Sequence, residues 1–207
     1  MTDEDARAWV SATVPRETEQ SLSRFASLVI EANAAQNLIA RSTEDHIWSR
    51  HIADSLQLLR FLPQTGTICD LGSGPGFPGI PLAIATEARF VLVESRRRRI
   101  DFLLHCIAAL GLGDRVDVFG GQAERLRHVP FAAITARAFA PLDRLFRTTD
   151  HLADRGTRWI LPKGRGAAAE LAAVRGSWQG NFRIERSLTD ADASILIADD
   201  VRPGSKE

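Results

Sequence analysis

The sequence lacks several features that would point to export or to a membrane. No apolar run approaches the roughly 18 residues that a bilayer-spanning helix needs. The first twenty residues are acidic and polar, without the apolar core of an export signal. Only two cysteines are present, Cys69 and Cys106, and both lie in apolar segments far apart in the chain. We therefore expect a cytoplasmic protein with buried, reduced thiols and no membrane partner.

An excess of positive charge is also missing. The 26 basic residues are balanced by 26 acidic ones, whereas a nucleic-acid-binding protein is more often basic. Lys163 and Lys206 are the only lysines, so 26 − 2 = 24 of the basic residues are arginines. Genomic base composition explains this bias, and so does the suitability of guanidinium groups for phosphates and stacked bases. Composition alone does not decide between the two.

Metal-ligand spacing is absent as well. The histidines other than His51 show no such spacing with cysteines or carboxylates, so we expect no metal; they are His46, His105, His128 and His151.

The first 65 residues are predicted to form a helical extension. Apolar residues between Leu22 and Ala35 recur at intervals of three and four, which is helical spacing. Ser42 is expected to cap a second helix whose apolar stripe runs from Ile47 to Leu59. Pro63 and Gly66 end that helix, and residues 66–207 then form the second part of one structural unit.

After Gly66, short apolar runs alternate with amphipathic helices, which is the pattern of a βαβ fold. Helices are expected at 81–86, 100–110 and 166–175. Strands are expected at 67–71, 90–93, 116–119, 132–136, 158–161, 182–188 and 194–198. The fold class is therefore α/β, with a seven-stranded, mostly parallel sheet. The last two strands are too close in sequence for a crossover helix and should pair antiparallel.

A glycine-rich loop follows the first predicted strand, with the sequence Asp70-Leu-Gly72-Ser-Gly74-Pro-Gly76-Phe77. Glycines let the chain turn tightly and let a ligand approach bare backbone. Glu94 ends the second strand 18 residues after Gly76, near the spacing at which an acidic side chain binds the ribose of an adenosine cofactor. Loop and carboxylate together predict such a cofactor at the switch point of the sheet.

The charge near this loop discriminates between cofactors. A dinucleotide site is typically G-x-G-x-x-G beside a pyrophosphate, and an acidic residue such as Asp70 is unfavourable there. Asp70 suits instead the cationic amino group and sulfonium of S-adenosylmethionine. The loop therefore favours methyl transfer over hydride transfer.

Several segments together resemble the bacterial small-subunit ribosomal RNA methyltransferase G family, also called glucose-inhibited division protein B. The resemblance runs from about residue 33 to 165 in the family's order and spacing. It is carried by residues 37–38, 50–55, 70–81, 94–103, 123–124, 136–138 and 161–164. It implies a Rossmann-like S-adenosylmethionine-dependent methyltransferase that methylates N7 of a guanine in 16S ribosomal RNA, with the small subunit or its RNA as partner. We further expect a monomer that does not act on DNA.

The resemblance also implies roles for individual residues. Gly72 and Phe77 belong to the cofactor loop, Ala123 and Glu124 flank the adenine, and Arg137 ends the fourth strand at the site. Together with the loop argument, the expected cofactor-binding set is Asp70, Gly72, Gly74, Gly76, Phe77, Glu94, Ala123, Glu124 and Arg137. Arg137 and Lys163 are the candidate catalytic residues, each as a holder of the guanine or its phosphate.

RNA contacts are expected from Arg50, His51, Arg96, Arg97 and Lys163. Arg50 and Asp54, and likewise His51 and Ser55, are four residues apart on the predicted second helix and so able to touch. A surface ion pair and a buried histidine are the alternative interpretations of that segment. The arginines that begin at Arg96 also fit a solvated helix face, although they follow the strand end next to the predicted cleft.

Guanine N7 has a lone pair and no proton to lose, so its methylation requires no general base, and positioning supplies most of the acceleration. Three alternatives remain open: a methyltransferase of a small molecule or protein, a nicotinamide-dependent oxidoreductase, and an RNA-binding module without activity.

Overall fold

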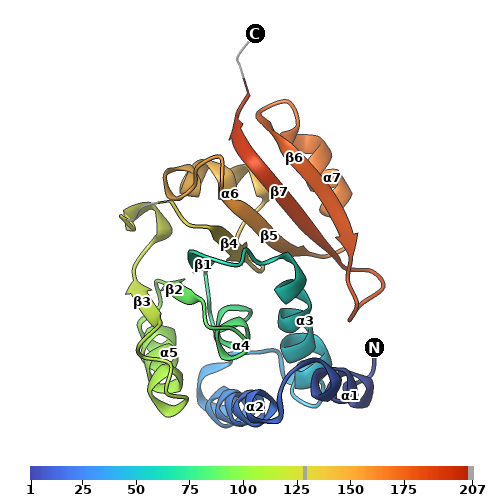
Figure 1. Ribbon diagram of the computed structural model, residues 1–207, viewed down its shortest axis with the longest axis vertical. Coiled ribbons are helices and arrows are strands. Elements are labelled where there is room, and N and C mark those ends of the chain that lie inside the picture. The colour runs from blue at the N-terminus through green and yellow to red at the C-terminus, as the bar shows by residue number, and fades with distance from the viewer. Residues whose placement is uncertain (128–129, 205–207) are drawn as a thin grey trace.

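The structure, a computed structural model, describes residues 1–127 and 130–204, and these residues form one mixed sheet covered by helices (Figure 1). Within them the sheet has seven strands in the order β3-β2-β1-β4-β5-β7-β6. The strands are β1 (Thr67–Leu71), β2 (Arg89–Glu94), β3 (Val116–Gly120), β4 (Ala133–Ala136), β5 (Arg158–Lys163), β6 (Trp178–Arg186) and β7 (Ser194–Pro203). The first five are parallel, and β7 runs antiparallel to both β5 and β6. The predicted fold class and the antiparallel last pair are confirmed.

The helices are α1 (Asp3–Thr13), α2 (Arg16–Gln36), α3 (Ala53–Leu56), α4 (Gly79–Ile84), α5 (Arg97–Ala109), α6 (Leu142–Thr149) and α7 (Ala167–Val174). Two of them, α1 and α6, were not expected from the sequence. A capping box between Thr2 and Asp5 starts α1, which buries only Ala6 and Val10. The helix α6 has just eight residues, too few for its buried stripe to stand out as a repeat.

Alternate residues along each strand face opposite sides of the sheet, and both sides are covered. In β1, Ile68 packs in the core shared with helices α1 to α5, whereas Cys69 and Leu71 pack in the core shared with α6 and α7. Figure 1 shows α1 to α5 on one side of the sheet and α6 and α7 on the other. Burial on both faces is typical of a parallel sheet and explains its nearly continuous apolar strands.

The segment between α2 and β1 differs most from its prediction. Instead of one helix capped by Ser42, it contains a 3₁₀ turn at Arg41–Thr43, a π-helical turn at Trp48–Ile52, α3, and a 3₁₀ turn at Gln57–Phe61. The cap prediction for Ser42 is wrong. A tertiary contact accompanies the break: the backbone N–H of Ser49 donates to the Asp3 carboxylate of α1 over 2.8 Å. Such π-turns occur often at functional sites.

Both cysteines are buried and free, as predicted. Burial raises the pKa of Cys106 to about 12 and that of Cys69 well above its ordinary value, with the Asp70 charge as a second cause for Cys69. Thiols held in this protonated form are poor nucleophiles. No helix in the described ranges has the length and apolar character that crossing a bilayer requires.

Candidate active site

Two neighbouring cavities open at the carboxyl ends of the central strands. The smaller, of about 250 Å³, is called here the loop cavity; its lining includes Gly72, Glu94, Gly121, Ala123, Glu124, Phe139 and Arg144. The larger, of about 680 Å³, is called the mouth cavity; its lining includes Arg50, His51, Asp54, Gln57, Arg137, Phe139, Lys163, Glu170 and Asp190. Phe139 and Ala140 line both cavities, so the loop after β4 forms their common wall.

Glu94 lines the loop cavity, and several hydrogen bonds hold its carboxylate in place. One carboxylate oxygen accepts the backbone N–H of Gly74 at 3.1 Å, and the other accepts those of Ser95 at 2.7 Å and Arg96 at 2.9 Å. A guanidinium nitrogen of Arg99 lies 3.7 Å from the first oxygen. The side chain is 6% exposed, so these bonds hold a charged group at the cavity wall in a defined orientation.

Gly72 is the one glycine of the loop that lines this cavity, and its shape depends on having no side chain. Its φ is +68°, and a Cβ built there would meet a ring carbon of Phe139 at 2.8 Å. Gly74 and Gly76 also have positive φ angles of 56° and 96°, but they turn the loop without lining either cavity.

Asp70 lines neither cavity, and its contact with a cofactor stays a prediction. Its carboxylate is fully buried, accepting a hydrogen bond from the Thr135 hydroxyl at 2.8 Å and from the Gly79 N–H at 3.3 Å. Burial raises the pKa of Asp70 to about 6, and hydrogen bonds from Thr135, Ser73 and Gly79 partly oppose that shift. Asp70 therefore joins β1, β4 and the start of α4.

Phe77 also lines neither cavity, and its contact with the cofactor stays a prediction. Its ring is buried against Phe25 of α2, with ring centroids 5.1 Å apart, and stacks on His51 at 4.9 Å. The guanidinium carbon of Arg137 lies 5.3 Å from the Phe77 ring centroid. Phe77 thus connects the glycine loop with the helical extension.

Arg137 lines the mouth cavity, and the His51 ring holds its guanidinium group. One guanidinium nitrogen lies 3.2 Å from His51 Nδ1, and because a guanidinium only donates, Nδ1 is the acceptor. The ring proton is then on Nε2, which donates to the Thr43 hydroxyl at 3.0 Å, and that hydroxyl donates to the Ala40 carbonyl. Burial lowers the pKa of His51 to about 3, with further contributions from the charges of Arg137 and Arg50.

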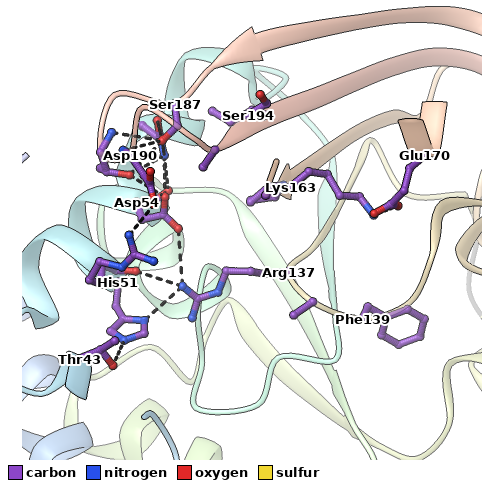
Figure 2. Close-up of a pocket in the computed structure, with 18 of the residues that line it drawn as sticks. Thr43, His51, Asp54, Arg137, Phe139, Lys163, Glu170, Ser187, Asp190 and Ser194 are labelled. Atoms are coloured by element: carbon purple, nitrogen blue, oxygen red, sulfur yellow. Dashed lines mark hydrogen bonds and ion pairs between the residues drawn. The ribbon is translucent and has the colours of Figure 1, made fainter. Parts of the chain in front are cut away.

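Asp54 neutralises Arg137 at 3.6 Å and joins it to the turn between β6 and β7 (Figure 2). The Thr189 hydroxyl donates to Asp54 at 2.9 Å, and Gln57 donates to the same oxygen at 2.8 Å. The Gln57 side-chain oxygen accepts the backbone N–H of Leu188 at 2.8 Å. Asp54 and Gln57 therefore couple the helical extension to residues some 130 positions later.

Lys163 also lines the mouth cavity, but its ammonium group extends away from Arg137 in Figure 2, toward Glu170. The two groups form an ion pair at 2.8 Å, and the lysine side chain is 12% exposed. Glu170 also has a structural contact: the same carboxylate oxygen accepts a hydrogen bond from the backbone N–H of Leu142 at 3.2 Å. The structure thus places both predicted catalytic cations in one cavity with their charges directed to different sides.

Of the two i, i+4 pairs considered for the second helix, Arg50 and Asp54 do not form an ion pair, and Ser55 contacts His51 through the His51 backbone only. Arg50 binds Asp190 at 2.7 Å instead of Asp54. The Ser55 hydroxyl donates to the His51 carbonyl rather than to its ring. His51 is a buried side chain at the cavity wall, as one of the two alternative interpretations held.

The arginines after β2 are not gathered at either cavity. Arg97 is exposed and forms an i, i+4 ion pair with Asp101 at 3.0 Å, while Arg99 approaches Glu94 from below the cavity lining. Neither Arg96 nor Arg97 lines the loop cavity or the mouth cavity. Their contact with RNA stays a prediction.

Phe139, Gln57 and the turn at 187–190 were missed by the sequence analysis. Phe139 follows Arg137 at the end of β4, where a side chain must face the cleft, so its position was available as a signal. Nothing in the local sequence relates Gln57 to Leu188. His128 lies outside the described residues, and within 1–127 and 130–204 no three metal-binding side chains cluster.

The fold is that of Rossmann-like methyltransferases. An O-methyltransferase from Bacillus cereus, solved in complex with SAH, gives a TM-score of 0.56 at 20% identity, covering 85% of this chain and 90% of that one. The ribosomal protein L11 methylase of Lactobacillus delbrueckii subsp. bulgaricus gives 0.58 at 14% identity, with 73% and 79% covered.

Sequence relatives define the family. The family described as rRNA small subunit methyltransferase G matches residues 18–194. A ribosomal RNA small subunit methyltransferase G from Rhizorhabdus wittichii is 48% identical over 209 residues, covering 100% of this chain and 96% of the relative. That of Sphingopyxis alaskensis is 49% identical over 196 residues, covering 93% and 84%. The chain belongs to the rRNA small subunit methyltransferase G family, and the resemblance noted in its sequence is confirmed.

Proposed function

We propose that the protein transfers the methyl group of S-adenosylmethionine to N7 of a guanine in small-subunit (16S) ribosomal RNA. The observation that carries this proposal is the junction of the two cavities at Phe139. The glycine loop and Glu94 line one cavity, and Arg137 and Lys163 line the other. A base entering through the mouth cavity meets Phe139 before it reaches the loop cavity.

The residues of the loop cavity fit the cofactor. A carboxylate has about four lone-pair sites, so Glu94 retains capacity for a ribose hydroxyl beside the three N–H groups that it accepts. The absence of a side chain at Gly72 lets the Phe139 ring lie against the loop, and Ala123 adds only a methyl group to the lining. Glu94, Gly72, Ala123 and Glu124 are the proposed cofactor contacts. Gly74, Gly76, Asp70 and Phe77 are proposed to shape the glycine loop, to which Gly72 belongs.

When bound, S-adenosylmethionine supplies an electrophilic methyl group. The protein's own task is to hold guanine N7 in line with that group and to exclude competing orientations, which is worth about 7–11 kcal/mol when alignment is good. Arg137 and Lys163 are proposed to hold the guanine or its phosphate from two sides of the mouth cavity. Phe139 is proposed to stack on the base once it has left its helix.

Neither His51 nor Asp70 is available as a general base. His51 has a pKa of about 3, and its accepting nitrogen already binds Arg137. Asp70 has a pKa of about 6 but is fully buried outside both cavities. This arrangement suits N7 as the acceptor, because N7 has no proton to remove.

The remaining expectations belong to the same proposal. Residues 1–65 act as a helical extension and residues 66–207 as the methyltransferase domain of one unit. The protein acts as a monomer in the cytoplasm, on ribosomal RNA or the small subunit and not on DNA.

The test is methyl transfer from labelled S-adenosylmethionine to purified 16S ribosomal RNA and to small ribosomal subunits, in parallel. Nuclease digestion and mass spectrometry should identify 7-methylguanosine in at least one of the two substrates. The Glu94→Ala variant serves as the control that separates enzymatic from contaminating activity. Methylation of another atom, or of neither substrate, would refute the proposal.

A further inference from the structure

Two ion pairs join the turn between β6 and β7 to two other segments near the mouth cavity, the π-turn and the loop after β5. Asp190 binds Arg50 of the π-turn at 2.7 Å, and Asp192 binds Arg165, two residues after Lys163, at 2.6 Å. Arg50 and Asp190 line the cavity, and Gly164 and Ala193, the chain neighbours of the second pair, line it too. One short turn therefore places a carboxylate on each of two guanidinium groups, one in the cavity lining and one beside it.

These pairs are easily exchanged. The side chains of Arg50 and Arg165 are 51% and 83% exposed, and exposed pairs contribute only about 0–1 kcal/mol to stability. A guanidinium binds a phosphate through the same planar, two-point geometry that it uses for a carboxylate. A phosphodiester arriving at the cavity can therefore replace either aspartate at little cost in stability.

The cations deeper in the cavity differ. Lys163 is 12% exposed in its pair with Glu170, and Arg137 is 23% exposed in its pair with Asp54. Both acidic partners have other hydrogen bonds: Glu170 accepts the N–H of Leu142, and Asp54 accepts from Thr189. Asp190 also has a second hydrogen bond, from the N–H of Asp192 to its other oxygen, so the outer pairs differ from the inner ones in the exposure of their basic side chains.

We propose that Arg50 and Arg165 form a phosphodiester-binding site at the opening of the mouth cavity, which Asp190 and Asp192 occupy in the free protein. The site rests on the proposed function, since its ligand is the backbone of the RNA that delivers the guanine. The carboxylates screen the arginines from other polyanions. A correctly placed RNA releases them by offering two phosphates at the spacing of the arginines.

The first arm of the test removes one arginine. Arg165→Ala should raise the Kd for 16S ribosomal RNA about three- to tenfold and reduce the slope of log K against log salt by about 0.7–0.9, the value for one lost phosphate contact. Its affinity for S-adenosylmethionine should not change. Arg155→Ala is the matched control, because Arg155 is 81% exposed and paired with Asp200 near the other end of β7. That variant should bind RNA like the parent protein.

The second arm removes a competing carboxylate. Asp192→Asn should tighten RNA binding about two- to fivefold. Asp200→Asn removes one negative charge at another position and should leave RNA binding unchanged. Asparagine also suits the left-handed backbone of Asp200, whose φ is +53°, so this control should fold normally.

The outcomes separate the two proposals. Failure of the parent protein to bind and methylate RNA would refute the proposed function, and this inference with it. If the parent methylates RNA and Arg165→Ala binds it with unchanged Kd and salt slope, the phosphodiester site alone is refuted. Equal tightening by Asp192→Asn and Asp200→Asn would show a general charge effect and also refute it.

Discussion

The guanidinium of Arg137 lies over the ring of Phe77, with its carbon 5.3 Å from the ring centroid. Phe77 belongs to the glycine loop and Arg137 follows β4, so this contact joins the glycine loop to the lining of the mouth cavity. His51 stacks on the other part of the same ring and binds Arg137 directly. The helical extension therefore contributes to the site itself and does not merely cover the sheet.

Glu94→Ala should weaken binding of S-adenosylmethionine by about 1–3 kcal/mol, because the backbone N–H groups and the ligand hydroxyls that it serves lose a buried charged partner. Isothermal titration calorimetry measures the change. Glu185→Ala, on the exposed face of β6, is the control and should bind as the parent does. Equal affinities for all three proteins would remove Glu94 from the site.

Gly72→Ala should also weaken cofactor binding, for a backbone reason. The residue has a φ of +68°, and its added Cβ would collide with the Phe139 ring. A left-handed conformation costs a residue with a side chain about 1–2 kcal/mol, and the displaced ring narrows both cavities. Gly113→Ala is the matched control, since nothing lies within 4 Å of its added Cβ. Calorimetry and thermal unfolding of both variants should show the effect at position 72 alone.

His51 should make stability depend on pH. Its pKa is about 3 in the folded protein against an ordinary 6.5, so between these values the unfolded chain binds more protons than the folded one. The free energy of unfolding therefore falls as the pH is lowered from 6.5 toward 3. Asp70 acts oppositely: its folded pKa of about 6 exceeds the ordinary 3.8, so its contribution grows as the pH falls from 6 to 3.8.

The variant His51→Gln isolates the histidine, because the Asp70 contribution is common to both proteins and cancels in the difference. Glutamine still offers Arg137 an acceptor oxygen. Urea unfolding at pH 7.5, 6 and 5 should show the parent losing stability relative to the variant as the pH falls. A difference that does not change with pH would mean that His51 titrates normally in the folded state.

Lys163→Ala should lower the methylation rate on ribosomal RNA about tenfold or more, the effect of losing one charge-assisted hydrogen bond of about 1.5–3 kcal/mol. Its affinity for S-adenosylmethionine should hardly change, because Lys163 lines the mouth cavity and not the loop cavity. Steady-state kinetics and calorimetry test the two statements separately.

Glu170→Gln is the informative companion variant. It removes the charge that holds Lys163 at 2.8 Å but keeps an acceptor for the N–H of Leu142. Its methylation rate should stay near that of the parent protein or exceed it. A loss as large as that of Lys163→Ala would show that the ion pair, rather than the lysine, is needed.

Patterns short in sequence predicted the fold and residues that line the loop cavity. The alternation of apolar runs and helices after Gly66 predicted the seven strands, because burial on both faces leaves a signal in every strand. The glycines from Gly72 to Gly76 and the carboxylate of Glu94 were also predictable from the sequence, because each lies at a strand end or within a few residues of one.

The tertiary structure decided what the residues at the mouth cavity contact. Arg50 pairs with Asp190 and not with Asp54 because a π-turn, accompanied by a contact from Asp3, rotates the helix that carries it. Gln57 meets Leu188 across 131 positions, and Arg137 meets His51 across 86. Periodicity and motif spacing report neighbours within a few residues. Contacts between the extension and the last hairpin depend on how the whole sheet positions both, and no local pattern encodes that.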